Sequence, residues 1–226
     1  MHIKSITKLI KSQKLDFNNI EHGFYSKNYQ PANKNKFISL KQIHSNKVVI
    51  YNVGDDVDKQ PADAIVTRAK NIAIAVYTAD CVPLILCDNI NNIIAVAHAG
   101  WRGAFAGIVQ NTITAMLSIG AQTANIAAAL MPAITQASYE VDAKFYEKFI
   151  EQKQTNNKFF KTGRKGHYQF DLKAYVVEQL YREGVNMVDV VDIDSFADQQ
   201  NCYSYRRACL TGEGNEGRHI SFIKQL

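Results

Sequence analysis

The sequence predicts an α+β fold built on mixed β-sheets. Three runs rich in valine, isoleucine and alanine follow one another at residues 72–77, 82–87 and 93–98. Short apolar runs of this kind are typical of strands buried on both faces. The turns between them are too short for the helical crossover that joins parallel neighbours. Strand and helix patterns interleave along the rest of the chain, which favours a mixed sheet over a doubly wound parallel sheet.

The other elements follow from the spacing of apolar residues. Strands are expected at 37–40, 47–51, 63–67, 125–130, 186–191 and 217–224. After residue 103 the apolar positions change to a helical period, which predicts a helix over 103–118 that ends near Gly120. Further helices are expected at 141–152 and 171–182, separated by a polar surface loop over 153–166. Neither a repeat nor a linker divides the chain, so residues 1–226 are expected to form one domain.

Composition excludes several classes of protein. The net charge of +5 is mild for 226 residues and the basic residues are scattered, so no nucleic-acid partner is expected. The exception is a lysine series at the start, which predicts one solvated face of a short helix: Lys4, Lys8, Lys11 and Lys14. Neither a signal peptide nor a membrane-spanning segment is expected. The four cysteines form no C-x-x-C pair and should stay reduced, which predicts a cytoplasmic protein.

A cysteine and a histidine stand at the ends of neighbouring predicted strands. Cys81 lies between two of the buried runs, and His98 ends the third, before the small residues Ala99 and Gly100. Such strand ends are where a rigid scaffold presents catalytic groups. Taken singly, Cys81 is simply a buried thiol and His98 a satisfied core histidine. Their pairing brings a functional interpretation level with the structural one.

A third candidate, His44, lies on the loop 41–46 between two predicted strands. Two histidines and a thiolate form a three-ligand set for zinc that leaves a fourth position for water or substrate. Zinc bound in this way lowers the pKa of a bound water toward neutrality. The spacings of 37 and 17 residues match no compact zinc motif. Chemistry alone therefore leaves open a metal-free hydrolase with Cys81 as nucleophile and His98 as base.

One motif matches a dinucleotide-binding pattern but is not expected to bind a dinucleotide. Residues 212–217 formally match G-x-G-x-x-G, but they precede a predicted strand, whereas a dinucleotide site requires a helix there. A hairpin or an exposed loop is expected instead.

Six motifs occur in an order that resembles the YfiH/laccase-domain family, also called the polyphenol oxidase or peptidoglycan editing factor family. They are Gln-Ile-His-Ser at 42–45, Thr-Ala-Asp-Cys-Val-Pro at 78–83, Ala-His-Ala-Gly-Trp-Arg-Gly at 97–103, Pro-Ala-Ile at 132–134, Tyr-Glu-Val at 139–141 and Ser-Tyr-Arg-Arg at 204–207. The resemblance implies a YfiH-like fold of two packed mixed sheets flanked by helices, and a zinc centre at His44, Cys81 and His98. It also implies phosphorolysis of adenosine, inosine and methylthioadenosine, together with adenosine deamination.

Phosphate needs fixed positive partners. Arg102 stands just before the predicted helix 103–118, where an anion is favoured, and Arg206 is a second candidate. For both arginines an ordinary salt bridge is an equal alternative. Asp80 either orients a ligand histidine as its hydrogen-bond partner or caps a turn, with the turn slightly favoured.

The chain departs from the family pattern at three places. Met131 replaces a glycine, Ser138 replaces a cysteine, and the segment 208–216 is longer than usual, with Ala208 where the family has aspartate. The first two changes are expected in a pocket wall, and the third puts the substrate preference in doubt. All three expected metal ligands are retained.

Two other functions are compatible with the resemblance. A copper-dependent polyphenol oxidase would need more histidines than the six in the chain can supply beyond the proposed site, so zinc is preferred to copper. The second function is that of a binding protein, which edits peptidoglycan precursors without turning over nucleosides. Purine nucleosides and phosphate are the expected partners, and the chain is expected to be a monomer or a homodimer.

Overall fold

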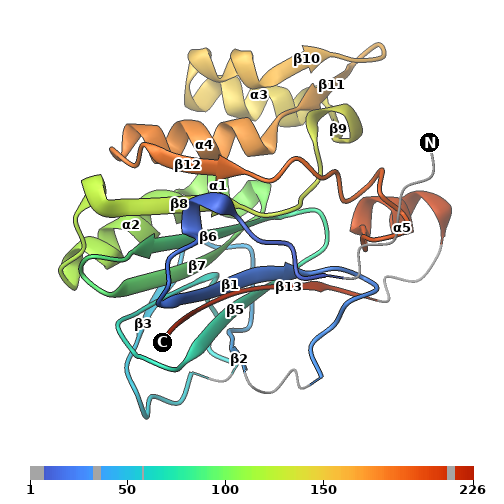
Figure 1. Cartoon of the computed structure of the whole chain (residues 1–226). Coiled ribbons are helices and arrows are strands. Elements are labelled where there is room, and N and C mark those ends of the chain that lie inside the picture. The colour runs from blue at the N-terminus through green and yellow to red at the C-terminus, as the bar shows by residue number, and fades with distance from the viewer. Residues whose placement is uncertain (1–7, 33–36, 58, 213–216) are drawn as a thin grey trace.

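Two mixed β-sheets pack face to face, and helices cover the outer face of the larger one (Figure 1). The computed structural model describes residues 8–32, 37–57, 59–212 and 217–226. The arrangement confirms the predicted fold class. None of the described helices is long and apolar enough to cross a lipid bilayer.

The larger sheet has six strands in the order β12-β8-β6-β7-β4-β3. These are β3 (Val48–Tyr51), β4 (Ala64–Thr67), β6 (Val82–Asp88), β7 (Ile93–Ala99), β8 (Ile126–Leu130) and β12 (Met187–Val190). The two outermost pairs are parallel and the inner pairs are antiparallel. The short turn between β6 and β7 requires the antiparallel pairing at the centre of the sheet.

The smaller sheet has the order β1-β13-β5-β2. It contains β1 (Ile20–Tyr25), β2 (Phe37–Ile38), β5 (Ala73–Thr78) and β13 (His219–Gln225). Strand β1 was not predicted, because Glu21, His22 and Gly23 interrupt its apolar run. It forms through its antiparallel pairing with β13, from the opposite end of the chain.

The four central strands of the six-stranded sheet are buried on both faces, as predicted for β6 and β7. Along β6, Val82 and Leu84 face the helices, whereas Ile85 and Cys87 face the four-stranded sheet. This alternation follows from the two-residue repeat of a strand. Two apolar layers therefore hold β6 and β7 in place, and the ends of these strands form a rigid platform.

The predicted helix over 103–118 is two helices. Helix α1 (Trp101–Ala106) ends at Gly107, which has a φ of 95°, and α2 (Ile108–Ser118) begins directly after it. The helical period of the apolar residues continues across the break, so the period alone did not indicate it. Helices α3 (Ala143–Gln152) and α4 (Leu172–Arg182) lie close to their predicted bounds, while α5 (Tyr205–Thr211) was not predicted.

The predicted surface loop over 153–166 is wrong in part. After a 3-10 helix at Gln154–Phe159, the strands β10 (Phe160–Thr162) and β11 (His167–Phe170) form a hairpin, and β9 (Glu140–Asp142) completes a small antiparallel sheet. Aromatic rings from this sheet pack on Phe145 and Phe149 of α3. The contacts that stabilise the hairpin come from another helix, which explains why its own polar sequence did not predict it.

Two other predictions concern the ends of the chain. In the described part of the lysine series, residues 8–12 are not helical, because Ile10 forms a β-bridge with Phe24, and a 3-10 helix follows at Gln13–Leu15. The predicted N-terminal helix is therefore wrong over these residues, and Lys4 lies outside the described residues. Gly212 ends α5, but residues 213–216 of the expected loop also lie outside the described residues.

Candidate metal centre

His44, Cys81 and His98 converge at one edge of the six-stranded sheet. Their ligand atoms all lie within 4.8 Å of one another, and the two imidazole rings stand 4.7 Å apart at an angle of 76°. His98 is buried, Cys81 is half-buried and His44 is exposed. The three residues singled out in the sequence therefore form one cluster that is open on the side of His44.

The pairing of β6 with β7 brings Cys81 and His98 together. Pro83 of β6 lies opposite His98 of β7, and Val82 lies opposite Ala99. Cys81, which directly precedes β6, is consequently beside the end of β7. Since both strands are anchored in apolar layers on both faces, the separation of these two side chains is set by the sheet.

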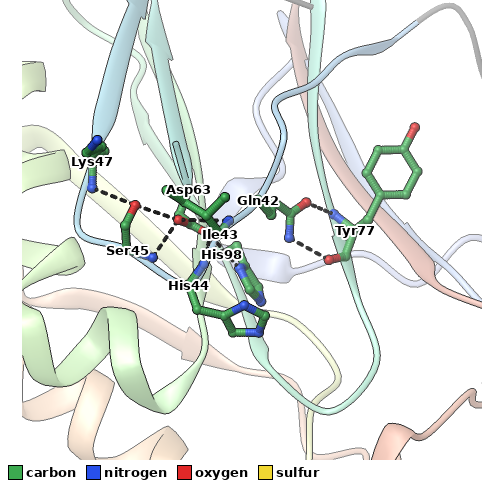
Figure 2. A network of polar contacts seen from close by, with 8 residues as sticks. All are labelled: Gln42, Ile43, His44, Ser45, Lys47, Asp63, Tyr77 and His98. Carbon is green, nitrogen blue, oxygen red and sulfur yellow. Dashed lines mark hydrogen bonds and ion pairs between the residues drawn. The ribbon is translucent and has the colours of Figure 1, made fainter. Parts of the chain in front are cut away.

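Asp63 organises both histidines (Figure 2). Its carboxylate accepts hydrogen bonds from the backbone N–H groups of the loop that carries His44, at 3.0 Å from His44 and 2.6 Å from Ser45. The same carboxylate lies 2.8 Å from Nδ1 of His98. The Nδ1–H of His98 therefore donates to Asp63, which leaves Nε2 to bind a metal. One fully buried carboxylate thus sets the position of one ligand and the tautomer of another.

Gln42 attaches the same loop to the smaller sheet. Its side-chain amide donates to the carbonyl oxygen of Tyr77 and accepts from the backbone N–H of Tyr77, each at 2.7 Å (Figure 2). Tyr77 belongs to β5, the strand that leads to Cys81. His44 itself has a φ of 58°, a left-handed conformation that these surrounding bonds hold in place. The His44 loop is therefore fixed to both sheets.

Hydrogen bonds within the site shift the pKa values of Cys81, His98 and Asp63. Burial raises the pKa of Cys81, but hydrogen bonds from His44 and His98 outweigh it and lower the pKa to about 6. Burial lowers the pKa of His98, whereas its bonds to Asp63 and Cys81 raise it to about 9. Burial raises the pKa of Asp63, but hydrogen bonds from His98 and Ser45 lower it to about 2. The site therefore favours a thiolate, the charged form that binds metals.

Sequence reasoning missed Asp63 and left two roles open for Asp80. Asp63 was noted only as the start of a strand, and its contacts with residues 43–45 and 98 join segments far apart in the chain. A turn cap was slightly favoured for Asp80 over a contact with a ligand histidine, and the hydrogen bonds of its side chain go to other segments. The Asp80 carboxylate accepts hydrogen bonds from Ser195, Ser204 and Arg206.

A cavity of about 250 Å³ opens beside the cluster and is lined by His44 and Cys81. Both candidate phosphate ligands, Arg102 and Arg206, line it as well. Arg102 lies within α1, because the helix begins two residues earlier than predicted. Its guanidinium group stacks over the ring of Trp101 at 4.5 Å. Two of the candidate metal ligands and two arginine side chains therefore line the same cavity.

Both the backbone and the guanidinium group of Arg206 are hydrogen-bonded to other segments of the chain. Its backbone N–H donates to Asp80 at 2.7 Å, and Nη2 of its guanidinium group donates to the carbonyl oxygen of Glu140 at 2.7 Å. A guanidinium group carries five N–H donors, so this contact leaves others for a ligand.

Two departures from the family pattern lie away from this cavity. Met131 is fully buried between the two sheets, and the hydroxyl group of Ser138 donates to Asp194 at 2.6 Å. Neither residue is among those that line this cavity. Cys209, from the longer segment 208–216, does line the cavity.

The other described histidines are engaged elsewhere. Nε2 of His22 pairs with the backbone of Ser12, His167 contacts Arg164, and His219 bonds to the backbone of Tyr25. Groups of three or more histidine, cysteine, aspartate or glutamate side chains could also bind a metal. Within residues 8–32, 37–57, 59–212 and 217–226, the one such group with metal-binding geometry is the cluster of His44, Cys81 and His98.

Fold and site together define a protein with two packed mixed sheets and a His-Cys-His donor set at a sheet edge. The family model described as multi-copper polyphenol oxidoreductase laccase matches residues 25–225. The chain belongs to this family.

Individual relatives agree with this assignment. The chain is 39% identical over 171 residues to a purine nucleoside phosphorylase of Rickettsia prowazekii, covering 75% of this chain and 70% of the relative. It is 34% identical over 194 residues to the adenosine deaminase RL5 of an unknown prokaryotic organism, covering 81% and 72%. The crystal structure of the hypothetical protein YfiH of Bacillus licheniformis matches with a TM-score of 0.84 and 23% identity, over 93% of this chain and 94% of that one. This last likeness concerns the fold.

Proposed function

We propose that the protein is a zinc-dependent purine nucleoside enzyme. It cleaves adenosine, inosine and methylthioadenosine by phosphorolysis and also deaminates adenosine. The observation that carries the proposal is the convergence of His44, Cys81 and His98 beside a cavity. His44 and Cys81 line this cavity together with Arg102 and Arg206. The relatives named as a purine nucleoside phosphorylase and an adenosine deaminase support both activities.

The donor set fits zinc. Imidazole nitrogen and thiolate sulfur are the ligands that zinc prefers, and three protein ligands leave the open position of a catalytic site. The exposure of His44 and the cavity beside it support access of a substrate to a metal ion bound there. When bound, zinc lowers the pKa of a bound water and acts as a Lewis acid.

The surrounding residues provide the remaining functions. In phosphorolysis an oxygen of phosphate attacks C1′ of the ribose, the bond from C1′ to the base breaks, and the base leaves with a proton. Arg102 and Arg206 hold the phosphate by charge-assisted hydrogen bonds. Trp101 and Tyr139 line the cavity and offer aromatic faces to a purine. Burial raises the pKa of Tyr139, so its phenol stays protonated and can donate a hydrogen bond.

The test incubates purified protein with adenosine and phosphate and separates the products by chromatography. Adenine and ribose 1-phosphate are expected from phosphorolysis of adenosine. Inosine is expected from deamination, and hypoxanthine with ribose 1-phosphate from phosphorolysis of that inosine. His98→Ala and Cys81→Ala should abolish every product, because each removes one of three ligands. Circular dichroism checks that both variants stay folded. Turnover that persists in both variants would contradict the proposal.

Metal analysis separates this proposal from a metal-free hydrolase with Cys81 as nucleophile. One zinc per chain is expected in protein purified without added metal, and dialysis against a chelator should remove both zinc and activity. A protein that is active without any metal would instead support the thiol enzyme. Modification of Cys81 does not discriminate, because it disables either enzyme.

The description of the family model favours one other function, copper-dependent oxidation of phenols. The same two histidines and cysteine would bind one copper ion. A multicopper enzyme needs further histidines, and the other described ones contact protein groups away from this site. Uptake of oxygen with a phenol, dependent on added copper, would support that function.

A further inference from the structure

Helix α5 forms one wall of the cavity beside the metal centre. Tyr205, Arg206 and Cys209 of this helix all line the cavity. The helix has seven residues, none of which is fully buried, so packing alone holds it weakly. Its place therefore depends on the polar contacts at its first turn.

Two of those contacts end on the carboxylate of Asp80, directly before Cys81, and the guanidinium group of Arg207 supplies others. The Asp80 carboxylate accepts hydrogen bonds from the hydroxyl groups of Ser195 at 2.7 Å and Ser204 at 2.9 Å, and from the backbone N–H of Arg206 at 2.7 Å. Ser204 is also the N-cap of α5 and accepts from the N–H of Arg207. One carboxylate thus joins the turn that carries Cys81 to the beginning of α5.

The backbone of Asp80 is itself fixed. The residue has a φ of 85°, and its carbonyl oxygen accepts from the N–H of Ile134 at 3.0 Å. A left-handed conformation in a residue other than glycine is uncommon and requires support from its surroundings. In this conformation the side chain bonds to the beginning of α5.

We propose that Asp80 is a positioning residue that holds Arg206 at the cavity for the binding of phosphate. The inference rests on the proposed function, because it assigns the anion that Arg206 binds. The two aspartates then have separate tasks. Asp63 positions the metal ligands, and Asp80 positions the wall that receives the second substrate.

The choice of variant follows from the backbone. Asp80→Gly removes all three hydrogen bonds, and glycine adopts a φ of 85° without strain. Asp80→Asn keeps an acceptor for Ser204 and Arg206 and tolerates the same φ. The hydroxyl group of Ser195 can rotate to accept from the new amide. A role that is only conformational predicts no loss in the glycine variant, whereas the proposed role predicts a loss that asparagine restores.

Steady-state kinetics on the zinc-loaded enzyme are the main test. In Asp80→Gly the KM for phosphate should rise about tenfold. A change of this size is expected when a charged hydrogen bond that positions the phosphate-binding residue is lost. The KM for adenosine and kcat should stay within about threefold of the wild type, and Asp80→Asn should restore most of the affinity for phosphate. Equal rises in both KM values, or no rise, would overturn the proposal.

A double variant shows whether Asp80 acts through Arg206. Arg206→Ala alone should raise the KM for phosphate, and adding Asp80→Gly should raise it no further, because residues that act through one contact are not additive. Additive effects would contradict the inference. Asp63→Asn is the matched control at the other aspartate, and it should weaken zinc binding, which Asp80→Gly leaves unchanged.

Hydrogen exchange gives a readout that is independent of activity. Exchange of the Arg206 amide should speed up in Asp80→Gly and not in Asp63→Asn, since its acceptor is the Asp80 carboxylate. Unchanged exchange would overturn the structural part of the proposal. If the wild type shows no phosphorolysis but exchange changes as expected, the proposed function fails and the coupling of Asp80 to α5 stands.

Discussion

Gly100 lies where the backbone comes closest to the candidate ligands. A Cβ atom at this position would stand 2.9 Å from Sγ of Cys81 and 3.1 Å from Cδ2 of His44. The backbone of Gly100, with φ −68° and ψ 162°, is one that any residue can adopt. The requirement for glycine here is therefore one of space beside the metal centre.

Gly100→Ala should separate metal binding from stability. The added methyl group displaces Cys81 or His44, so zinc affinity should fall by about 10–100-fold, as for other changes next to ligands. The melting temperature of the metal-free protein should change little. Competition with a chromophoric chelator measures the affinity.

Gly166→Ala is the control for Gly100→Ala. Gly166 has a φ of 75° and open space around its Cβ position. That substitution should lower stability and leave zinc affinity unchanged. Wild-type zinc affinity in Gly100→Ala would show that the ligands do not meet as described.

At the scale of elements, the break between α1 and α2 decides where Trp101 and Arg102 lie. Gly107 ends α1 with φ 95° and ψ 32°, and its N–H donates to the carbonyl oxygen of Ala104. The break lets α2 follow the sheet while α1 begins at Trp101, directly after Gly100 beside the candidate metal centre. An unbroken helix over 103–118 would not give the two segments independent directions.

Gly107→Ala should destabilise the protein by about 1–2 kcal/mol, the cost of a left-handed conformation with a Cβ atom. The space around this position is sufficient, because a Cβ atom would meet only Oε1 of Gln110 at 3.5 Å. Urea denaturation measures the free energy of unfolding. Gly107→Asn should lower the free energy of unfolding by less, since asparagine tolerates the left-handed region of φ and ψ. Equal losses in both variants would assign the effect to another cause.

At the scale of the whole molecule, His219 joins distant parts of the chain. Nδ1 of this buried residue donates to the carbonyl oxygen of Tyr25 in β1, and Nε2 accepts from the N–H of Tyr203 before α5. Burial lowers its pKa from 6.5 to about 4. Protonation of Nε2 would also break the bond from Tyr203. The neutral ring therefore stabilises the connection between the smaller sheet and the segment leading to α5.

The lowered pKa of His219 predicts loss of stability in acid. The unfolded state binds a proton at a higher pH than the folded state. The contribution of His219 to the free energy of unfolding is therefore complete above pH 6.5 and is lost as the pH falls to about 4. A shift of this size corresponds to stabilisation on the order of 3 kcal/mol.

His219→Gln is the matched variant for this prediction. Glutamine keeps one donor and one acceptor without titrating in this range. Denaturation measured between pH 7 and pH 4 should show a smaller loss of stability in the variant than in the wild type. Parallel pH curves would contradict the assignment to His219.

Much of the architecture followed from local patterns. Strands β5, β6 and β7 were predicted because each is a short apolar run, and the short turn between β6 and β7 required their antiparallel pairing. The turn between β5 and β6 instead passes from the four-stranded sheet to the six-stranded one. Strand β1 and helix α5 were missed, because neither has a regular apolar period. Both form through contacts with segments more than a hundred residues away, β13 for the first and Asp80 for the second.

By itself the sequence determined the mixed-sheet fold class and singled out His44, Cys81 and His98, because apolar runs and reactive side chains are local properties of a chain. Only the tertiary structure decided what surrounds them. Asp63 contacts His98, and Asp80 contacts Arg206, across separations of 35 and 126 residues. A carboxylate gives no local sign of which distant donor it will meet, since that depends on how the two sheets and their connecting segments pack.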